Sequence, residues 1–331
     1  MTKSFRLLAA FSLMSVLATP LHATGLDLSR DDVSEFVARM ETSHGIPADE
    51  TRRLLGQAEI QPRIIEAMSR PAEKVKPWHE YRQIFITDKR IRAGVDFWSE
   101  RESDLEKIAA ETGVPAHIIA GILGVETFYG RITGKYRVID SLVTLAFEYP
   151  PRSKFFTSEL EQFLLLAQEQ DLDVLDATGS YAGAMGGPQF ISSSYRAYAV
   201  DASGDGQVNL WTDWTDIIGS VANYFAEHGW QPGGPVADRI DAAPPEAVLS
   251  KGLALDKTTA ELRQSGLRPQ GDDDDKVMVF SLEATTGPEY WIGYRNFYVI
   301  TRYNRSSMYA MAVYELGQEV RSLRETSADG S

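Results

Sequence analysis

A single glutamate closes an apolar stretch of this 331-residue chain. Glu126 stands in the motif GVETFYGR, directly after the apolar run 118–125. Apolar residues of that run recur at three- and four-residue spacing, so a helix here would direct Glu126 toward protein rather than open water. A carboxyl group in such a setting has a raised pKa and can donate a proton near neutral pH. The alternative is a structural ion pair with Arg131 or Arg137.

A glycine-rich segment, residues 179–195, combines backbone freedom with neutral polar side chains. Its sequence is GSYAGAMGGPQFISSSY. Glycines allow a backbone to approach a ligand closely, and serine, tyrosine and glutamine offer hydrogen bonds without charge. Aromatic faces also stack on sugar rings. The candidate contact residues are Ser180, Tyr181, Met185 and Gln189. A tight turn between two helices would have the same composition.

The segment DASGDGQVNLWTDWTD, residues 201–216, follows the first half of an EF-hand calcium loop. Such a loop places oxygen ligands at positions 1, 3 and 5, a glycine at 6 and a backbone carbonyl at 7. In this chain those ligands are Asp201, Ser203, Asp205 and Gln207. Position 12 is Thr212 rather than glutamate, so Asp213 or Asp216 would have to close the shell of a lengthened loop. A surface turn without metal is the alternative.

A fourth stretch, residues 296–314 (NFYVITRYNRSSMYAMAVY), alternates aromatic and polar side chains. Asn304 and Tyr309 are candidates for binding a sugar. On its own the pattern favours a plainer interpretation, an edge strand that leads into a helix with half-buried tyrosines. The five histidines show no paired metal spacing, and no G-x-S-x-G motif supports a serine hydrolase.

Helical periodicity dominates the elements that must position these residues. Apolar spacing predicts helices over residues 31–40, 50–68, 90–112, 117–130, 158–170, 216–228 and 306–325. Between residues 231 and 297 prolines and glycines cluster, and short β-like runs appear at 277–282 and 290–294. The acidic segment GDDDDK, residues 271–276, is typical of a solvated turn. The sequence therefore predicts a mainly helical protein with a small β-rich insertion at 233–297.

The overall charge excludes some classes of partner. The chain has a formal net charge of −14 at pH 7 and no strong basic run, so nucleic acid is not an expected ligand. Residues 1–23 have the pattern of a secretory signal peptide, with Lys3 and Arg6 before an apolar core; a buried helix or short anchor is the alternative. No other apolar stretch is long enough to span a membrane. The absence of cysteine excludes thiol catalysis and a lipid anchor on an N-terminal cysteine.

Taken together and in this order, the motifs resemble the membrane-bound lytic murein transglycosylase B family and its soluble relatives. They are GVETFYGR, GSYAGAMGGPQF, the EF-hand-like loop, VANYFAEHGW and YVITRYNRSSMYAMAVY, and the resemblance covers roughly residues 27–325. It implies a mainly α (α+β) fold with a lysozyme-like core, an accessory helical domain and a small β-rich insertion. The implied boundaries are a signal peptide (1–23), a helical accessory domain (24–115) on which a C-terminal helix (306–331) packs, the catalytic core (116–232), the β-rich domain (233–297) and a return to the core (298–331).

The resemblance also implies a reaction. The family cleaves the β-1,4 bond between N-acetylmuramic acid and N-acetylglucosamine in peptidoglycan, and leaves a 1,6-anhydro end because the sugar's own 6-hydroxyl replaces water. Glu126 would be the single acid and base. The implied substrate-binding residues are Ser180, Tyr181, Met185, Gln189, Tyr224, Tyr303, Asn304 and Tyr309. Catalysis would need no cofactor, and a structural Ca²⁺ would be held by Asp201, Ser203, Asp205, Gln207 and Asp216.

The absence of cysteine also bears on where the protein works. The named family member is a lipoprotein with an N-terminal cysteine, and this chain has none. We therefore expect a free periplasmic enzyme without membrane span or lipid anchor, whose partner is the glycan strand of peptidoglycan. A hydrolytic muramidase on the same fold would differ only in its product. A non-catalytic peptidoglycan-binding protein is the third alternative, although an intact Glu126 and the cleft motifs argue against it.

Overall fold

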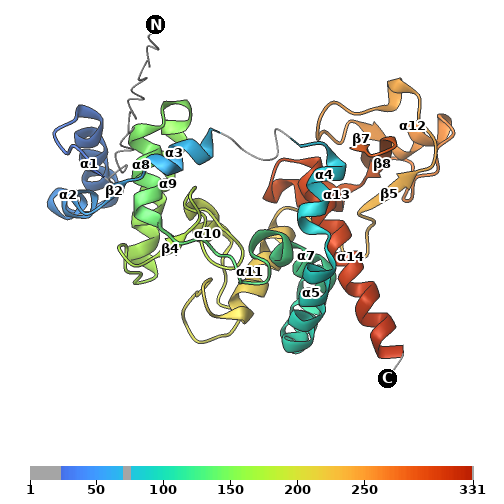
Figure 1. Ribbon diagram of the computed structural model, residues 1–331, viewed down its shortest axis with the longest axis horizontal. Coiled ribbons are helices and arrows are strands. Elements are labelled where there is room, and N and C mark those ends of the chain that lie inside the picture. Colours follow the sequence, from blue (N-terminus) through green and yellow to red (C-terminus); the bar gives the residue numbers. More distant parts are fainter. Residues whose placement is uncertain (1–23, 70–75, 330–331) are drawn as a thin grey trace, which may run out of the picture.

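The computed structural model describes residues 24–69 and 76–329, and its secondary structure is mainly helical (Figure 1). The predicted mainly α fold is confirmed. The predicted signal peptide, residues 1–23, lies outside the described residues. In the described ranges no single helix has the length and hydropathy needed to cross a bilayer. Helices α6 (Glu102–Thr112) and α7 (Ala116–Thr127) meet that criterion only when taken together, across a bend of 117°.

The N-terminal helices lie in two groups on opposite sides of the molecule (Figure 1). The first group packs on α8 (Val138–Glu148) and α9 (Ser153–Glu169) and consists of α1 (Asp31–His44), α2 (Ala48–Gly56) and α3 (Pro62–Met68). The second packs on α7, α11 (Trp214–Glu227) and α14 (Ser307–Asp329) and consists of α4 (Trp78–Phe85), α5 (Asp88–Glu100) and α6. The expected accessory domain, 24–115, is thus two helix groups with different neighbours.

Buried polar contacts tie the first group to α8. The short strands β1 (Thr24–Gly25) and β2 (Glu59–Ile60) pair with each other beside this helix. Asp140 of α8 is 4% exposed and accepts a hydrogen bond from the Glu59 amide at 2.9 Å. Its carboxylate also pairs with Arg137 at 2.8 Å. Asp140 therefore has a structural role that stabilises the attachment of this group.

Helix α7 lies at the centre of the second group. Nine of its 12 residues are buried, so it is enclosed by protein rather than amphipathic. Its contact with α14 requires glycine on both sides: a β-carbon at Gly121 would collide with the Val313 carbonyl, and one at Gly317 with the His117 carbonyl. Helix α14 also packs on α4 and α5. The C-terminal helix therefore packs on the core helix α7 as well as on part of the expected accessory segment.

The predicted β-rich insertion is an antiparallel sheet of order β5-β8-β7-β6. Its elements are β5 (Ala237–Ile240), β6 (Lys257–Thr258), α12 (Thr259–Gln264), β7 (Lys276–Ala284) and β8 (Gly287–Gly293). The β-like runs predicted at 277–282 and 290–294 fall largely within β7 and β8. This sheet has a hydrophobic cluster of its own, which includes Leu262, Val277 and Val279.

The aromatic stretch 296–314 is helical, so its interpretation as an edge strand is wrong. Helix α13 (Arg295–Tyr303) ends just before Asn304, and α14 begins at Ser307. The buried residues of α13 include Phe297 and Ile300, which are three positions apart and share one face of a helix. Tertiary packing of this face overrides the strand preference of its aromatic and β-branched residues.

The contact between α7 and α14 contains a histidine with a perturbed pKa. Burial, and secondarily the charge of Arg321, lowers the pKa of His117 from 6.5 to about 4. Between these two values the folded protein keeps a neutral imidazole while the unfolded chain binds a proton, so the free energy of unfolding falls as the pH falls.

We expect His117→Gln to remove this decrease in the free energy of unfolding. For wild type the decrease amounts to at most about 3 kcal/mol once the pH has fallen to the pKa of His117 in the folded protein, about 4. Urea denaturation of both proteins across the interval from 6.5 to about 4 measures it. The curve of unfolding free energy against pH should be flatter for the variant. His79→Gln, at a half-exposed histidine, is the control, and parallel curves for all three proteins would contradict the assignment.

Candidate active site

Glu126 is the penultimate residue of α7, where an unusual turn ends the helix. Residues 128–130 have φ values of 52°, 57° and 78°, all in the left-handed region. Two successive non-glycine residues in this region carry backbone strain, which surrounding contacts must offset. Tyr129 stacks on Phe97 of α5 with ring centroids 5.3 Å apart. The turn thereby fixes the point at which the Glu126 side chain leaves the helix.

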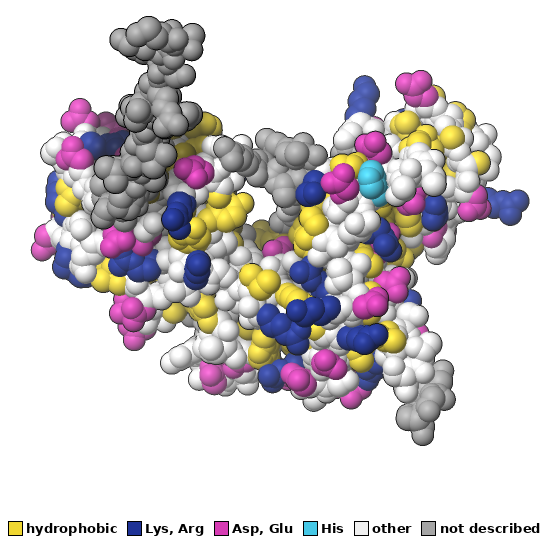
Figure 2. All heavy atoms as spheres, viewed as in Figure 1, with side chains coloured by type: hydrophobic (Ala, Val, Ile, Leu, Met, Phe, Trp, Pro, Cys, Tyr) yellow, Lys and Arg dark blue, Asp and Glu magenta, His cyan; other side chains and the backbone are white. Residues whose placement is uncertain are grey.

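Glu126 lines a cavity of about 450 Å³. Its wall is formed by the end of α7, the glycine-rich loop, α11 and the end of α13. The space-filling view is hollowed between the two sides of the molecule (Figure 2). The structure brings most of the predicted site residues to this one cavity: Glu126, Ser180, Tyr181, Gln189, Tyr224, Tyr303 and Asn304.

Tyr309 lies behind Glu126 rather than in the cavity wall. Its side chain is 3% exposed, and its hydroxyl donates a hydrogen bond to Glu126 Oε1. Burial raises the pKa of Tyr309 well above its ordinary value of 10.0, and the charge of Glu126 raises it further. The phenol is therefore protonated at neutral pH and remains a donor that fixes one oxygen of the carboxyl group.

Two further tyrosines form a rigid aromatic part of the wall. Tyr303 donates to the Pro188 carbonyl at 2.6 Å, and Tyr224 donates to the Arg302 carbonyl at 2.7 Å. Burial raises the pKa of both phenols, and the charge of Glu126 is the next cause for Tyr303. Because both hydroxyl protons are used on backbone carbonyls, these side chains offer a ligand mainly their ring surfaces.

Ser180 and Gln189 each use part of their hydrogen-bonding capacity to shape the glycine-rich loop. Ser180 Oγ accepts bonds from the amides of Ala182 and Ala184 at 3.2 and 3.1 Å. Gln189, with a φ of 53°, donates through Nε2 to two backbone carbonyls at 3.0 and 2.9 Å. The Ser180 O–H and the Gln189 Oε1 are not used in these bonds, so a donor and an acceptor remain for a ligand.

Met185 does not belong to the binding surface. Its side chain is 0% exposed, and its backbone forms isolated bridges with Gly179 and Phe190. The thioether fills the core beneath the loop, as methionine often does at irregular gaps. The prediction that Met185 contacts substrate is therefore wrong.

Several cavity residues were missed from the sequence. Phe190, Ile191, Ser194 and Arg302 line the cavity beside the predicted residues. The Arg302 guanidinium lies 4.3 Å from the Tyr298 ring, and its buried Nε has no hydrogen-bond partner among the described residues. Arg302 is the first residue of the motif RYN, which also contains the predicted residues Tyr303 and Asn304, and this position could have identified it from the sequence.

Tyr81 was also missed, and no sequence signal points to it. It lies on α4, is 2% exposed, and is among the groups that raise the pKa of Tyr309. A buried aromatic residue on a helix far along the chain has the pattern of an ordinary core residue. Only the packing of α4 on α14 brings it near Tyr309.

The EF-hand-like loop forms a turn around Asp201. This carboxylate accepts backbone hydrogen bonds from Gly204, Asp205 and Gly206, the last at 2.8 Å. These bonds, that from Gly206 foremost, lower the pKa of Asp201, which is therefore ionised at neutral pH. Ser203 Oγ lies 3.2 Å from the same carboxylate. The first half of the predicted ligand set is thus gathered in one turn.

Asp216 has a different role in the loop. It is 0% exposed near the start of α11, and it accepts amide hydrogen bonds from Ala202 and Ser203 on Oδ1 and from Asn209 on Oδ2. Both oxygens therefore hold the loop onto the helix. Among the described residues no group of three or more His, Asp or Glu side chains is placed to hold a metal ion. Asp201, Ser203, Asp205 and Gln207 are oxygen-bearing residues of the predicted ligand set that lie in this loop.

The fold and the cavity, with one carboxyl group at the end of a core helix, define a lysozyme-like glycan-cleaving enzyme. The chain matches the family described as Transglycosylase SLT domain over residues 29–318, and it belongs to this family. The predicted family, the lysozyme-like core and the assignment as a lytic transglycosylase are thereby confirmed.

Relatives with solved structures agree with this assignment. The chain is 43% identical over 304 residues to membrane-bound lytic murein transglycosylase B of Escherichia coli K12, covering 88% of this chain and 83% of the relative. The soluble lytic transglycosylase SltB1 of Pseudomonas aeruginosa superposes with a TM-score of 0.84 at 52% identity, covering 89% of this chain and 99% of that one. The Escherichia coli lytic transglycosylase Slt35 in complex with calcium has a TM-score of 0.82 at 42% identity, covering 91% and 96%.

The Tyr309 hydroxyl makes a charge-assisted bond that can be removed without changing the shape of the side chain. We expect Tyr309→Phe to lower the rate of peptidoglycan cleavage roughly ten- to hundredfold, because such a bond contributes about 1.5–3 kcal/mol. Tyr314→Phe on the same helix is the matched control, since Tyr314 accepts a bond from Gln318 away from the cavity. Initial rates on purified sacculi measure the effect; equal rates for both variants would show that this bond does not serve catalysis.

Proposed function

We propose that Glu126 is the single acid and base with which this transglycosylase cleaves the β-1,4 bond between N-acetylmuramic acid and N-acetylglucosamine. One observation carries the proposal: among the described residues that line the cavity, Glu126 is the only carboxylate. Most glycosidases use two carboxyl groups, about 5 Å apart when they retain configuration and roughly 6.5–9.5 Å apart when they invert it. A cavity with one acid suits neither arrangement.

The next two acids along the chain are engaged elsewhere. Asp140 pairs with Arg137 and accepts the Glu59 amide, while Glu148 pairs with Arg30. Both carboxylates hold helices together on the side of α8, and neither lines the cavity. These contacts support a mechanism in which the substrate itself supplies the second catalytic group.

The muramic acid residue carries that group. Its 2-acetamido oxygen attacks C1 as Glu126 protonates the leaving glycosidic oxygen, so the C1–O bond breaks and an oxazolinium-like intermediate forms. The ionised Glu126 then removes the proton from the 6-hydroxyl, whose oxygen attacks C1 and expels the acetamido oxygen. The carboxyl group returns to its starting protonation state, and the product has a 1,6-anhydro ring without consumption of water.

The surrounding residues suit the binding of a neutral sugar. Tyr309 donates to Glu126 Oε1 and so fixes the orientation of the carboxyl group at the cavity. Ser180, Gln189 and Asn304 offer uncharged hydrogen-bonding groups at the wall. Tyr181 is 38% exposed, so its ring is accessible for stacking on a sugar. Tyr224 and Tyr303 would add aromatic surface.

The test is the product formed from purified sacculi by wild type and by Glu126→Gln. Wild type should release muropeptides one water lighter than hydrolysed ones, and the variant should lose at least about a thousandfold in rate, because it cannot transfer the proton. Glu227→Gln, at the exposed end of α11, is the control for loss of a carboxylate. Reducing-end products would identify a hydrolytic muramidase, and turnover by Glu126→Gln would overturn the assignment.

We also propose that the loop around Asp201 binds a structural Ca²⁺. The ion would be held by the Asp201 and Asp205 carboxylates, the Ser203 hydroxyl and the Gln207 carbonyl, all hard oxygen ligands. The calcium complex of the similar Slt35 supports this assignment. Asp216 would orient the loop rather than bind the ion, since both its oxygens accept amide hydrogen bonds. No cofactor enters the reaction scheme.

Addition of calcium to chelator-treated protein should raise the melting temperature by about 5 °C, because an ion that binds only the folded state adds stability by mass action. The variant Asp201→Asn/Asp205→Asn should lose this response. Asp241→Asn/Asp274→Asn, which removes two exposed carboxylates elsewhere, should keep it. Thermal unfolding with and without calcium measures the difference. An equal response in all three proteins would place the ion elsewhere.

We further propose that the protein is exported by residues 1–23 and acts in the periplasm. Support comes from the leader pattern in the sequence. Its partner there would be the glycan strand of peptidoglycan.

A further inference from the structure

A cluster of cations surrounds the aromatic ring that follows Glu126. Lys89, Arg90 and Arg131 place their charged groups 5.8, 4.8 and 5.0 Å from the centroid of the Phe128 ring. Arg92 joins Lys89 and Arg131 in lining an open hollow of about 490 Å³. These four residues, Lys89, Arg90, Arg92 and Arg131, are called the cationic cluster below.

The cationic cluster is not neutralised by the protein. Among the described residues none of its members has a carboxylate within 4.0 Å, although many other arginines of the chain form such pairs. Asp88 and Asp96 line the same hollow as Lys89, Arg92 and Arg131, so cations outnumber carboxylates there by three to two. Like charges held together without close ion pairs raise the free energy of the folded protein. An anionic ligand would remove that cost.

A purely structural role accounts for only one member. Arg90 is half-buried, lies between Phe85 and Phe128, and donates to the Ile84 carbonyl at 3.1 Å. Its positive charge near the C-terminal end of α7 also interacts favourably with the helix dipole. Lys89, Arg92 and Arg131, by contrast, are exposed to solvent. Surface cations can interact with the dipole of a helix without converging on one hollow.

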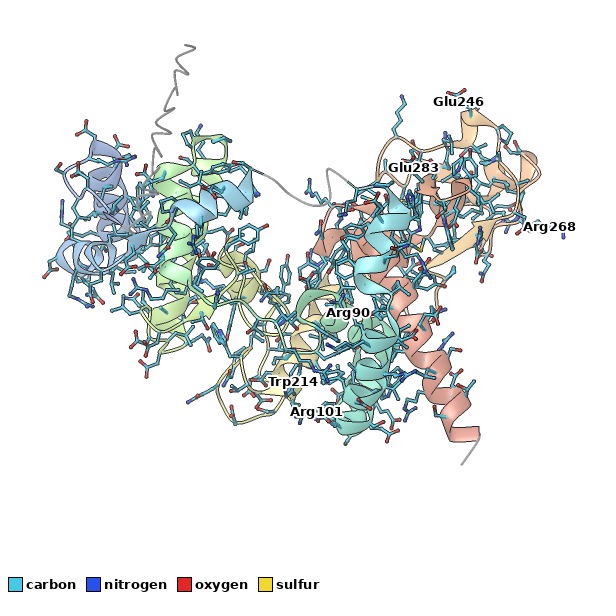
Figure 3. The ribbon with its side chains drawn as sticks, viewed as in Figure 1. Arg90, Arg101, Trp214, Glu246, Arg268 and Glu283 are labelled. Atoms are coloured by element: carbon cyan, nitrogen blue, oxygen red, sulfur yellow. The ribbon has the colours of Figure 1, made fainter. Side chains whose placement is uncertain are left out.

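The cationic cluster lies beside the active-site cavity. Phe128 follows Glu126 by two residues, in the strained turn that ends α7. In Figure 2 Lys and Arg side chains gather on the face below the hollow between the two sides, and Figure 3 labels Arg90 at this place. The cationic cluster therefore lies at the same end of α7 as Glu126.

We infer that the cationic cluster binds carboxylates of the peptide stems that branch from the glycan strand in the cavity. The inference rests on the proposed function. A peptide stem ends in a carboxylate, and guanidinium groups bind carboxylates with paired hydrogen bonds. The chain as a whole has a net charge of −14, which repels an anionic polymer. A local excess of cations beside the cavity offsets this repulsion where the substrate enters.

The test compares native sacculi with sacculi whose carboxylates have been converted to amides by a carbodiimide and ammonia. The variant is Lys89→Gln/Arg92→Gln/Arg131→Gln, which leaves the half-buried Arg90 in place. The control is Arg52→Gln/Arg63→Gln/Lys107→Gln, which removes three exposed cations without a described ion pair elsewhere. On native sacculi the KM of the cluster variant should rise about tenfold, because three modest surface contacts are lost together. The control should match wild type.

On amidated sacculi wild type and the cluster variant should have equal KM values. On native sacculi the difference between their KM values should shrink as salt is added. Equal KM values on native sacculi would overturn the inference, and so would an equal defect on both substrates. If wild type cleaves neither substrate, the proposed function fails, and co-sedimentation with the two kinds of sacculi still tests the cluster. Loss of binding to vesicles of anionic phospholipid, without an effect on sacculi, would assign the cluster to a membrane and overturn the inference.

Discussion

The close approach of α7 and α14 is the constraint on which the rest of the structure depends. Gly121 and Gly317 allow backbone of each helix to lie where a side chain would otherwise stand. This approach brings the first turn of α14 against the last turn of α7, so Tyr309 meets Glu126. A catalytic carboxyl group needs one defined orientation, and two rigid helices supply it better than a loop. The packing of α7 against α14 thus determines the position of one oxygen atom of the Glu126 carboxyl group.

The cavity then combines a rigid aromatic wall with an adaptable polar one. Tyr224 stacks on His228 with centroids 4.0 Å apart, and its hydroxyl is fixed to a carbonyl of α13. The opposite wall is the glycine-rich loop, where Ser180 and Gln189 are held by backbone bonds. The aromatic wall presents ring surfaces to the ligand, while the loop presents polar groups. This division suits a substrate that is apolar on its sugar faces and polar at its rim.

The sequence predicted best those features that depend on local pattern. The position of Glu126 at the end of an apolar helix followed from spacing, and the glycine-rich loop followed from composition. Features that depend on long-range packing were not accessible in this way. Nothing local separates Met185, which is buried, from its exposed neighbour Tyr181. Asp216 matched a metal ligand by type, but its burial directs both oxygens to backbone amides. The helix α13 was predicted as a strand because it contains aromatic and β-branched residues, which favour strands. Burial of one helical face outweighs that preference.

The two helix groups of the N-terminal segment have a consequence for how the chain could be rearranged. Because α1–α3 cover α8 and α9 while α4–α6 cover α7 and α14, each side of the molecule is built from one early and one later part of the chain. Recombination between relatives at the boundary near residue 76 would therefore mismatch the contact of α1–α3 with α8 and α9, while the contacts of α4–α6 with α7 and α14 would stay within one parent. Viable chimeras should carry α1–α3 together with α8 and α9. The elements that must be exchanged together are those that share an interface, not those that are adjacent in the sequence.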